Sequence, residues 1–196
     1  HLFFLNMDGI TCDHEILTKT GWKSVYDIKV TEDELYACEV IIHDQIDPLG
    51  LEKLETKYLR PLKINFESNY KGQFYNIKNE YIDIVMNDRY KLPCPFEHHE
   101  NRYENYTDFY NIDRIKSFID DGNKLLYFCN TKKDKDIFQS DIGYNMFSLK
   151  PEDIKPINPV DTSIFNILMP SEAFYNYEGR SYYRVYVRRN NKEFWM

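Results

Sequence analysis

Residues Asp8 to Ile28 read DGITCDHEILTKTGWKSVYDI, and the tetrapeptide Thr11-Cys12-Asp13-His14 within them decides how the chain is interpreted. Apolar residues on both sides of the tetrapeptide predict a short β-run, which the Thr20-Gly21 pair ends. Thr11 and His14 lie three residues apart, so they would face opposite sides of a regular strand. Their side chains converge only if the chain bends between them.

A threonine hydroxyl beside a histidine imidazole can take part in acid–base catalysis. The hydroxyl donates a hydrogen bond and the imidazole exchanges protons near neutral pH, which together polarise a carbonyl group and move a proton. The alternative is structural. In that interpretation Thr11 is present for its β propensity and His14 caps a turn.

The wider pattern T-x-x-H-x-(I/V)-L-T-x-x-G-W, followed by Asp-Ile, resembles the Hint superfamily of inteins and hedgehog-type autoprocessing domains. The matching residues are Thr11, His14, Leu17, Thr18, Gly21, Trp22 and Ile28. In that family, the threonine and histidine sit beside a peptide bond that a cysteine or serine rearranges to a (thio)ester. The resemblance therefore implies that Thr11 and His14 are the catalytic candidates. We also expect Trp22 to pack nearby as a buried anchor that binds nothing.

A second stretch can be compared with the first. Val85 to Leu92 aligns with Ile10 to Leu17, which places Met86 at the position of Thr11 and Arg89 at that of His14. Hint domains are built from two related halves, and this weak repetition agrees with that. Chance similarity in a chain rich in tyrosine and asparagine is the rival explanation.

The closing residues Tyr177 to Met196 form a further block. They contain Y-x-G-x-x-Y and V-R-R-N-N-K, and Asn190-Asn191 predicts a hairpin turn with positive φ angles. The block resembles the C-terminal part of a phage and large-virus subset of Hint proteins, with Asn191 where that pattern has glycine. An earlier Y-x-G, Tyr70 to Gly72, predicts another strand entry.

The expected fold is mainly β: a compact Hint-like fold with one or two short helices, that is, a β-rich α+β class. A helix is predicted over 108–121, capped by Thr107 or Asp108, and a second one from Pro48 to Leu59, where leucine spacing is nearly helical. Three parts are expected: residues 1–92 with the T-x-x-H block, an insertion-like 93–170 with one helix, and 171–196, whose strands pack back on the first part.

Charge limits the class of partner. The chain has 25 basic and 32 acidic residues and a net charge of −7, so nucleic-acid binding is not expected. A basic run near the C-terminus is interpreted as a solvated strand face; it consists of Arg180, Arg184, Arg188, Arg189 and Lys192. No apolar run reaches the roughly 20 residues of a membrane span, so membrane partners are not expected either. Other proteins are the expected partners.

The four cysteines, Cys12, Cys38, Cys94 and Cys129, have no C-x-x-C spacing, so we expect reduced thiols and an intracellular reducing compartment or a virion. Cys94, His98 and His99 resemble a metal cluster but lack a nearby fourth ligand. We therefore expect neither a metal nor a cofactor.

Two functions remain open. Splicing needs a cysteine or serine that starts an upstream block and a terminal His-Asn pair, and neither is visible between His1 and Met196. The first hypothesis is therefore a Hint-like domain that is catalytically silent and serves as a structural or interaction module. A composition heavy in Asn, Ile, Lys and Tyr suits a large DNA virus or a phage, and hence a viral particle. The alternative is an active autoprocessing domain whose nucleophile and asparagine lie outside these residues.

Overall fold

The computed structural model describes residues 3–42, 51–97, 105–122, 124–129, 138–139, 145–171 and 180–196. These residues form three antiparallel sheets, and the predicted mainly β fold class is confirmed. The described helices are one α-helix and two 3₁₀ turns: α1 (Ile112–Asp120), η1 (Val25–Asp27) and η2 (Pro151–Asp153).

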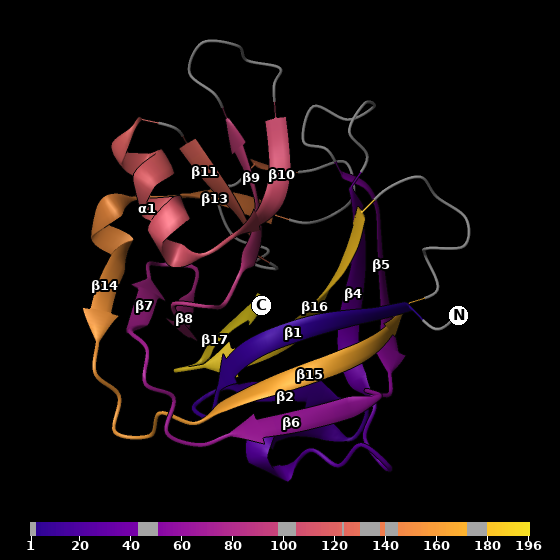
Figure 1. The fold of residues 1–196 in the computed structure, drawn as a ribbon. Coiled ribbons are helices and arrows are strands. Elements are labelled where there is room, and N and C mark those ends of the chain that lie inside the picture. The colour runs from indigo at the N-terminus through magenta and orange to yellow at the C-terminus, as the bar shows by residue number, and fades with distance from the viewer. Residues whose placement is uncertain are drawn as a thin grey trace.

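Sheet A forms the centre of the molecule and has six strands in the order β14-β7-β8-β1-β15-β6 (Figure 1). Its longest strand, β1, carries a bulge at Gly9, where φ is +91°. A Cβ on Gly9 would lie 2.8 Å from the Asn87 side chain, so the close approach of these strands requires glycine here. The strands are β1 (Phe3–Thr11), β6 (Lys63–Glu67), β7 (Phe74–Lys78), β8 (Asp83–Asn87), β14 (Ile154–Ile157) and β15 (Ile164–Ser171).

The chain enters sheet B and sheet C directly from sheet A, each time through a tight turn after a strand of sheet A: β1 before sheet B and β8 before sheet C. Sheet B runs β17-β16-β2-β4-β5, with β3 paired to β2; sheet C runs β10-β9-β11-β13-β12. Sheet B contains β2 (Glu15–Thr18), β3 (Gly21–Ser24), β4 (Leu35–Ile42), β5 (Leu51–Leu59), β16 (Arg180–Arg189) and β17 (Lys192–Trp195). Sheet C contains β9 (Leu92–Glu97), β10 (Asn105–Tyr110), β11 (Lys124–Cys129), β12 (Phe138–Gln139) and β13 (Asn145–Leu149).

The strand pairings are duplicated. In the first half β2 pairs with β3 and β4, and β4 pairs with β5; in the second half β9 pairs with β10 and β11, and β11 pairs with β13. If β1, β6 and β7 are exchanged with β8, β14 and β15, respectively, sheet A has the same strand order read from its opposite edge. A pseudo-twofold axis therefore passes between β1 and β8, at the pairing of Ile10 with Met86.

The duplication corrects the sequence comparison by one residue. β1 ends at Thr11 and β8 ends at Asn87, and each strand is followed by a turn. The amide of His14 donates to the Thr11 carbonyl over 3.4 Å, and the amide of Tyr90 donates to the Asn87 carbonyl over 3.3 Å. Asn87 and Tyr90, instead of Met86 and Arg89, therefore take the places of Thr11 and His14.

The two halves exchange strands across the axis. β7 follows the first half in sequence but pairs with β8 and β14, whereas β15 pairs with β1 and β6. All of β15 except Ser171 falls within the predicted 93–170 part, and β16 of the 171–196 part pairs with β2 and β4. The division into three parts stays a prediction.

One large buried cluster takes side chains from all three sheets and from α1. Ile10 and Met86 at the axis are fully buried, and so are Leu35 of sheet B, Leu92 of sheet C and Ile115 of α1. Each such aliphatic side chain contributes about 1.5–3 kcal/mol when it leaves water. The cluster holds the exchanged halves in fixed positions around the axis.

The predicted helix from Pro48 to Leu59 is wrong over its described residues, because Leu51 to Leu59 form β5. This strand pairs with β4 from Leu35↔Leu59 to Ile42↔Leu51, with an irregularity between Ile41 and Ile42. An irregularity changes which side chains share a face, so spacings of three residues also occur in a strand. Local spacing was therefore ambiguous, and pairing with β4 decided the outcome.

The helix predicted over 108–121 is confirmed in kind but is shorter. Thr107 and Asp108 belong to β10, and α1 begins after Asn111, whose side chain accepts a hydrogen bond from the Arg114 amide over 3.0 Å. Its apolar face packs on the core through Ile112, Ile115, Phe118 and Ile119. The predicted C-terminal turn is confirmed as well, since Asn190 and Asn191 have φ angles of 48° and 62° between β16 and β17.

Candidate functional site

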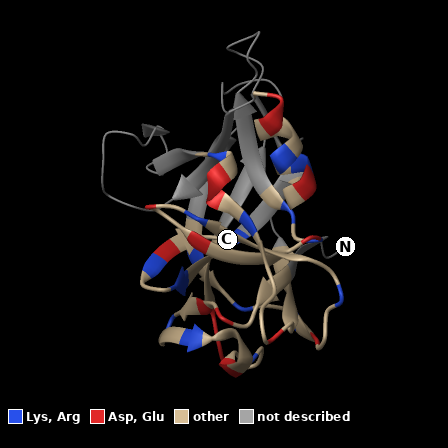
Figure 2. Ribbon diagram, turned by 90° about the vertical axis from the view of Figure 1, so that its left-hand side faces the viewer, with Lys and Arg blue, Asp and Glu red and all other residues tan. Residues whose placement is uncertain are grey.

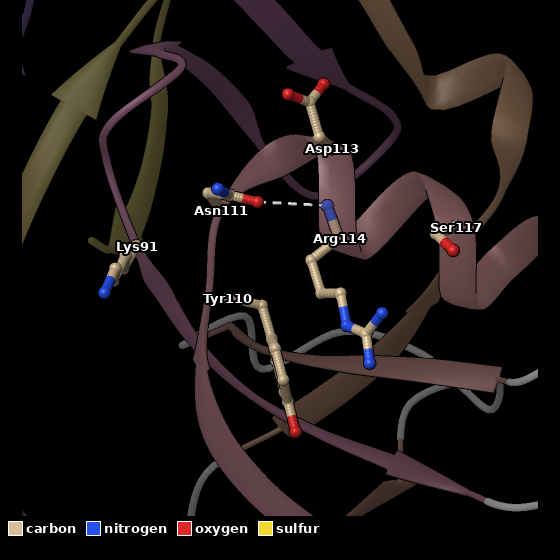
Figure 3. Close-up of a pocket in the computed structure, with 6 residues that line it drawn as sticks. All are labelled: Lys91, Tyr110, Asn111, Asp113, Arg114 and Ser117. Carbon is tan, nitrogen blue, oxygen red and sulfur yellow. Dashed lines mark hydrogen bonds between the residues drawn. The ribbon is translucent and has the colours of Figure 1, made fainter.

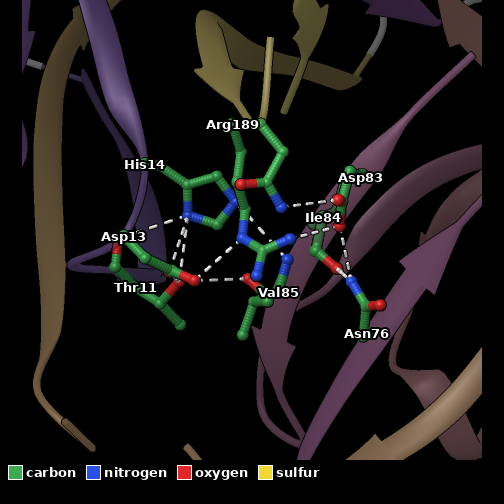
Figure 4. Close-up of polar contacts among 9 residues, drawn as sticks. Thr11, Asp13, His14, Asn76, Asp83, Ile84, Val85 and Arg189 are labelled. Atoms are coloured by element: carbon green, nitrogen blue, oxygen red, sulfur yellow. Dashed lines mark hydrogen bonds and ion pairs between the residues drawn. The ribbon is translucent and has the colours of Figure 1, made fainter. Parts of the chain in front are cut away.

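The turn between β1 and β2 brings Thr11 and His14 together. Four residues reverse the chain there, and the Thr11 hydroxyl oxygen lies 2.9 Å from Nδ1 of His14 (Figure 4). Both residues are buried, with 2% and 1% of their surface exposed. The predicted bend and the predicted contact between these two side chains are therefore present.

Both ring nitrogens of His14 have protein partners. The backbone amide of Val85, on β8, lies 3.4 Å from Nε2 and can only donate, so Nε2 is the unprotonated nitrogen. Nδ1 then carries the proton and donates to the Thr11 hydroxyl, with the Thr11 carbonyl 3.2 Å away. His14 thus joins the turn of the first half to the first strand of the second half.

The Thr11 hydroxyl passes the hydrogen-bond chain to Asp13. It donates over 2.5 Å to the Asp13 carboxylate, while the Val85 carbonyl lies farther away at 3.3 Å. The order of donation is therefore from His14 to Thr11 and from Thr11 to Asp13. This order fixes the ring orientation of His14 and its Nδ1–H tautomer.

Arg189, the last residue of β16, connects Asp13 to a second carboxylate on β8. Its Nε donates to Asp13 over 2.8 Å and its Nη1 donates to Asp83 (Figure 4). Asp83 also accepts hydrogen bonds from Asn190 over 2.9 Å and from Asn76 over 2.8 Å. The side chain of Asp83 is 2% exposed and that of Arg189 is 19% exposed, so this charge pair is largely removed from water.

The pKa values follow from burial and from these partners. Burial lowers the pKa of His14 below its ordinary value of 6.5, and the Asp13 carboxylate opposes that shift only in part. Burial pushes the pKa of Asp83 upward, but Asn190, Asn76 and Arg189 outweigh it and hold the pKa below the ordinary value. Burial likewise raises the pKa of Asp13, and His14, Thr11 and Arg189 reverse the shift. His14 is therefore neutral at pH 7, and both carboxylates are ionised.

Sequence reasoning singled out Thr11 and His14 but did not connect them to Asp13, Asp83 or Arg189. Asp13 lies inside the quoted tetrapeptide and was passed over. The contact between Asp83 and Arg189 spans 106 positions, so no local pattern indicates it. The interpretation of the basic run as a solvated strand face is wrong for two of its members. Arg184 is 2% exposed, and Arg189 lies in the network.

Trp22 lies on β3 and is half-buried, whereas a buried anchor was predicted. Its ring packs against Tyr186 at 5.7 Å, and the guanidinium group of Arg188 lies 4.6 Å above it. Arg188 also contacts Glu15, with the shortest distance 2.9 Å. Trp22 thus helps to hold β16 on β2 and β3.

Cys12, the remaining residue of the turn, is a poor nucleophile. Burial and the neighbouring Asp161 carboxylate raise the pKa of its thiol to about 11. Asp161 in turn accepts a hydrogen bond from the Tyr26 hydroxyl over 2.7 Å. Because the thiolate is the reactive form, Cys12 is unreactive at neutral pH.

A shallow open pocket of about 470 Å³ lies apart from this network, at the start of α1 (Figure 3). Asn111 uses its side chain to cap the helix, and Arg114 lies over the Phe118 ring at 4.7 Å, so both are already engaged. The pocket is lined by Lys91, Tyr110, Asn111, Asp113, Arg114 and Ser117. None of the residues predicted from the sequence as a site lines this pocket.

No group of three or more possible metal ligands occurs among the described residues. His98 and His99 of the predicted cluster lie outside the described ranges. Acidic and basic residues are both scattered over the described ribbon, as Figure 2 shows. No helix in the described part of the chain is long and apolar enough to cross a membrane.

Comparisons with known proteins returned no relative. No known protein family matches the chain, and neither the curated proteins nor the solved structures contain a significant match.

Proposed function

We propose that this chain is a Hint-like domain that is catalytically silent and serves as a structural or interaction module for other proteins. The observation that carries the proposal is the state of His14. Both of its nitrogens are bonded to the protein, and none of its side chain is exposed. The T-x-x-H turn then holds the two halves together instead of performing acyl chemistry.

Two features support kinship with the Hint superfamily. The T-x-x-H turn brings Thr11 and His14 into contact at 2.9 Å, as the resemblance implies. The fold also consists of two halves with equivalent strand pairings that exchange strands across a pseudo-twofold axis. Neither feature depends on the other, since one is a local sequence pattern and the other an arrangement of the whole chain.

The geometry argues against proton transfer by His14. A general base needs a lone pair directed at the proton that it removes, and the lone pair on Nε2 is occupied by the Val85 amide. Its other nitrogen donates to Thr11, whose hydroxyl is committed to Asp13. To act on a substrate, the pair would have to break these bonds and leave buried polar groups unsatisfied, at about 1–3 kcal/mol each.

The second candidate function is an active autoprocessing domain. One observation favours it: the hydrogen-bond chain from His14 through Thr11 ends at Asp13, whose side chain is 42% exposed. A proton could pass along this chain to solvent if the His14–Val85 bond opened. Acyl rearrangement would still need a nucleophile at the scissile bond.

Intact-mass measurement of the full-length gene product distinguishes the two functions. The silent module predicts one species at the mass of the translated chain, for the wild type and for His14→Gln alike. A cleaved or ligated product in the wild type that is lost in a folded His14→Gln variant would contradict the proposal. Lys19→Ala is the matched control, because the Lys19 side chain, in the next turn along the chain, is 65% exposed.

A further inference from the structure

Exposed apolar side chains gather around one edge of sheet A. Leu62 precedes β6 directly and is 41% exposed, and Phe66 within β6 is 54% exposed. Tyr26, 50% exposed, packs against Phe66 with ring centroids 5.9 Å apart. The described large hydrophobic residues that are exposed are Tyr26, Tyr58, Leu62, Phe66 and Val160. Contiguous exposed apolar surface of this kind marks an interaction site.

The backbone of β6 is open at the same place. Among the described strands β6 pairs with β15 alone, so one side of its amides and carbonyls has no strand partner. The pseudo-twofold counterpart of β6 is β14, at the other edge of sheet A, and β14 carries Pro156, which cannot donate to a ladder. β6 has no proline. Of these two equivalent edges, only β6 is suited to accept another strand.

The sequence of β6 is complementary to itself. β6 reads Lys-Ile-Asn-Phe-Glu from residue 63 to residue 67. When two copies run antiparallel about a twofold axis at Asn65, Lys63 faces Glu67 of the second copy and Ile64 faces Phe66 of the second copy. Opposite charges and aromatic–aliphatic pairs directly across a ladder both stabilise pairing.

We propose that β6 pairs with β6 of a second copy of this chain, so that sheet A continues across a twofold axis into the second molecule. The apolar pairs lie on the face that carries Leu62, Phe66 and Tyr26, and the Lys63–Glu67 pairs lie on the other face. Arg89 contacts Oε2 of Glu67 at 2.8 Å, which leaves Oε1 to accept from the lysine of the second copy. Lys63 itself forms no ion pair with any described residue.

We assign the partner of β6 to a second copy of this chain because β6 itself supplies both members of every cross-strand pair. The net charge of −7 on each molecule opposes association at long range, so the dimer is weak and forms at high protein concentration. This inference goes beyond the proposed function and does not depend on Thr11 or His14.

The test is sedimentation velocity over a concentration series with charge-reversal variants. Lys63→Glu places two glutamates opposite each other across the ladder, and Glu67→Lys places two lysines opposite each other. Each single variant is expected to weaken the dimer by about tenfold or more, since two like-charge pairs form per interface. In an equimolar mixture of the two variants, the mixed dimer has opposite charges at both pairs, because one copy supplies two glutamates and the other supplies two lysines. The double variant Lys63→Glu/Glu67→Lys restores both pairs in a dimer of identical copies.

The double variant is therefore expected to dimerise like the wild type, and its recovery also shows that the single changes leave the chain folded. Lys155→Glu makes the same charge change on the exposed β14 edge and is expected to leave the dimer unchanged. The proposal is overturned if the wild type stays monomeric throughout the series, if either single variant dimerises as well as the wild type, or if the double variant fails to recover. Capture of a different protein by β6 would appear as a wild-type monomer and is thus a contradicting result.

Discussion

Two side chains, His14 and Arg189, join segments that are far apart in the sequence. His14 connects the β1–β2 turn to Val85 of β8, and Arg189 connects the same turn and Asp83 of β8 to the end of β16. Their importance comes from burial. Partners that are removed from water lose far more free energy when one of them is deleted than exposed partners do.

The neighbouring arginines Arg188 and Arg189 allow this difference to be measured. Arg189→Met leaves the carboxylate of Asp83, whose side chain is 2% exposed, without its cation, and we expect the free energy of unfolding to fall by about 3 kcal/mol. Arg188→Met removes a contact with Glu15 between side chains that are 32% and 43% exposed, and a loss of about 1 kcal/mol or less is expected. Urea denaturation of both variants measures the two values. Equal losses would show that Arg189 is an ordinary surface residue.

His14 gives the stability of the fold a predictable pH dependence. Its folded-state pKa lies below 6.5, so the unfolded chain takes up a proton more readily than the folded chain as the pH falls. The stabilisation is complete above the unfolded pKa and is lost as the pH falls from 6.5 through the folded pKa. Asp13 and Asp83, whose pKa values lie below 3.8, add a further loss in more acidic solution.

Urea denaturation at several pH values between about 7.5 and 5 measures this dependence. The wild type is expected to lose stability on acidification across that range, and His14→Gln is expected to lose less. Parallel slopes for the two proteins would rule out a buried neutral His14.

At the scale of elements, turns were the features that sequence predicted best. Asn190-Asn191 specifies its hairpin because asparagine tolerates positive φ. The T-x-x-H turn was predictable because the side chains of Thr11 and His14 cannot meet on a straight strand. β5 was misassigned because its leucine spacing fits both a strand and a helix, and only its pairing with β4 selects the strand. The Asp83–Arg189 contact was beyond reach because nothing local encodes a partner 106 positions away.

The β16–β17 turn is open to a direct test at Asn191, where φ is 62°. Asn191→Ala forces a side chain with Cβ and no compensating local hydrogen bond into the left-handed region, and a loss of about 1 kcal/mol is expected. Asn191→Gly, which introduces the residue of the resembled pattern, is expected to cost nothing or to stabilise. Thermal denaturation of the two variants orders them. Alanine as stable as glycine would contradict the observed turn geometry.

The whole molecule consists of two halves with equivalent strand pairings and different residues at their turns. Thr11 and His14 in the first half correspond to Asn87 and Tyr90 in the second, and only the first turn builds the network with Asp13 and Arg189. Since β7 and β15 cross to the opposite half, the network fastens two units that are already interlocked. His14 is therefore a fixed joint between the halves.

Nitrogen-15 NMR of the histidine side chains, recorded as a pH titration, tests that role of His14 most directly. His14 is assigned by its loss in His14→Gln. We predict an Nδ1–H tautomer with Nε2 unprotonated, and a titration displaced to lower pH than the ordinary 6.5. An Nε2–H tautomer, or a His14 that titrates at or above its ordinary pKa, would contradict a fixed, buried joint.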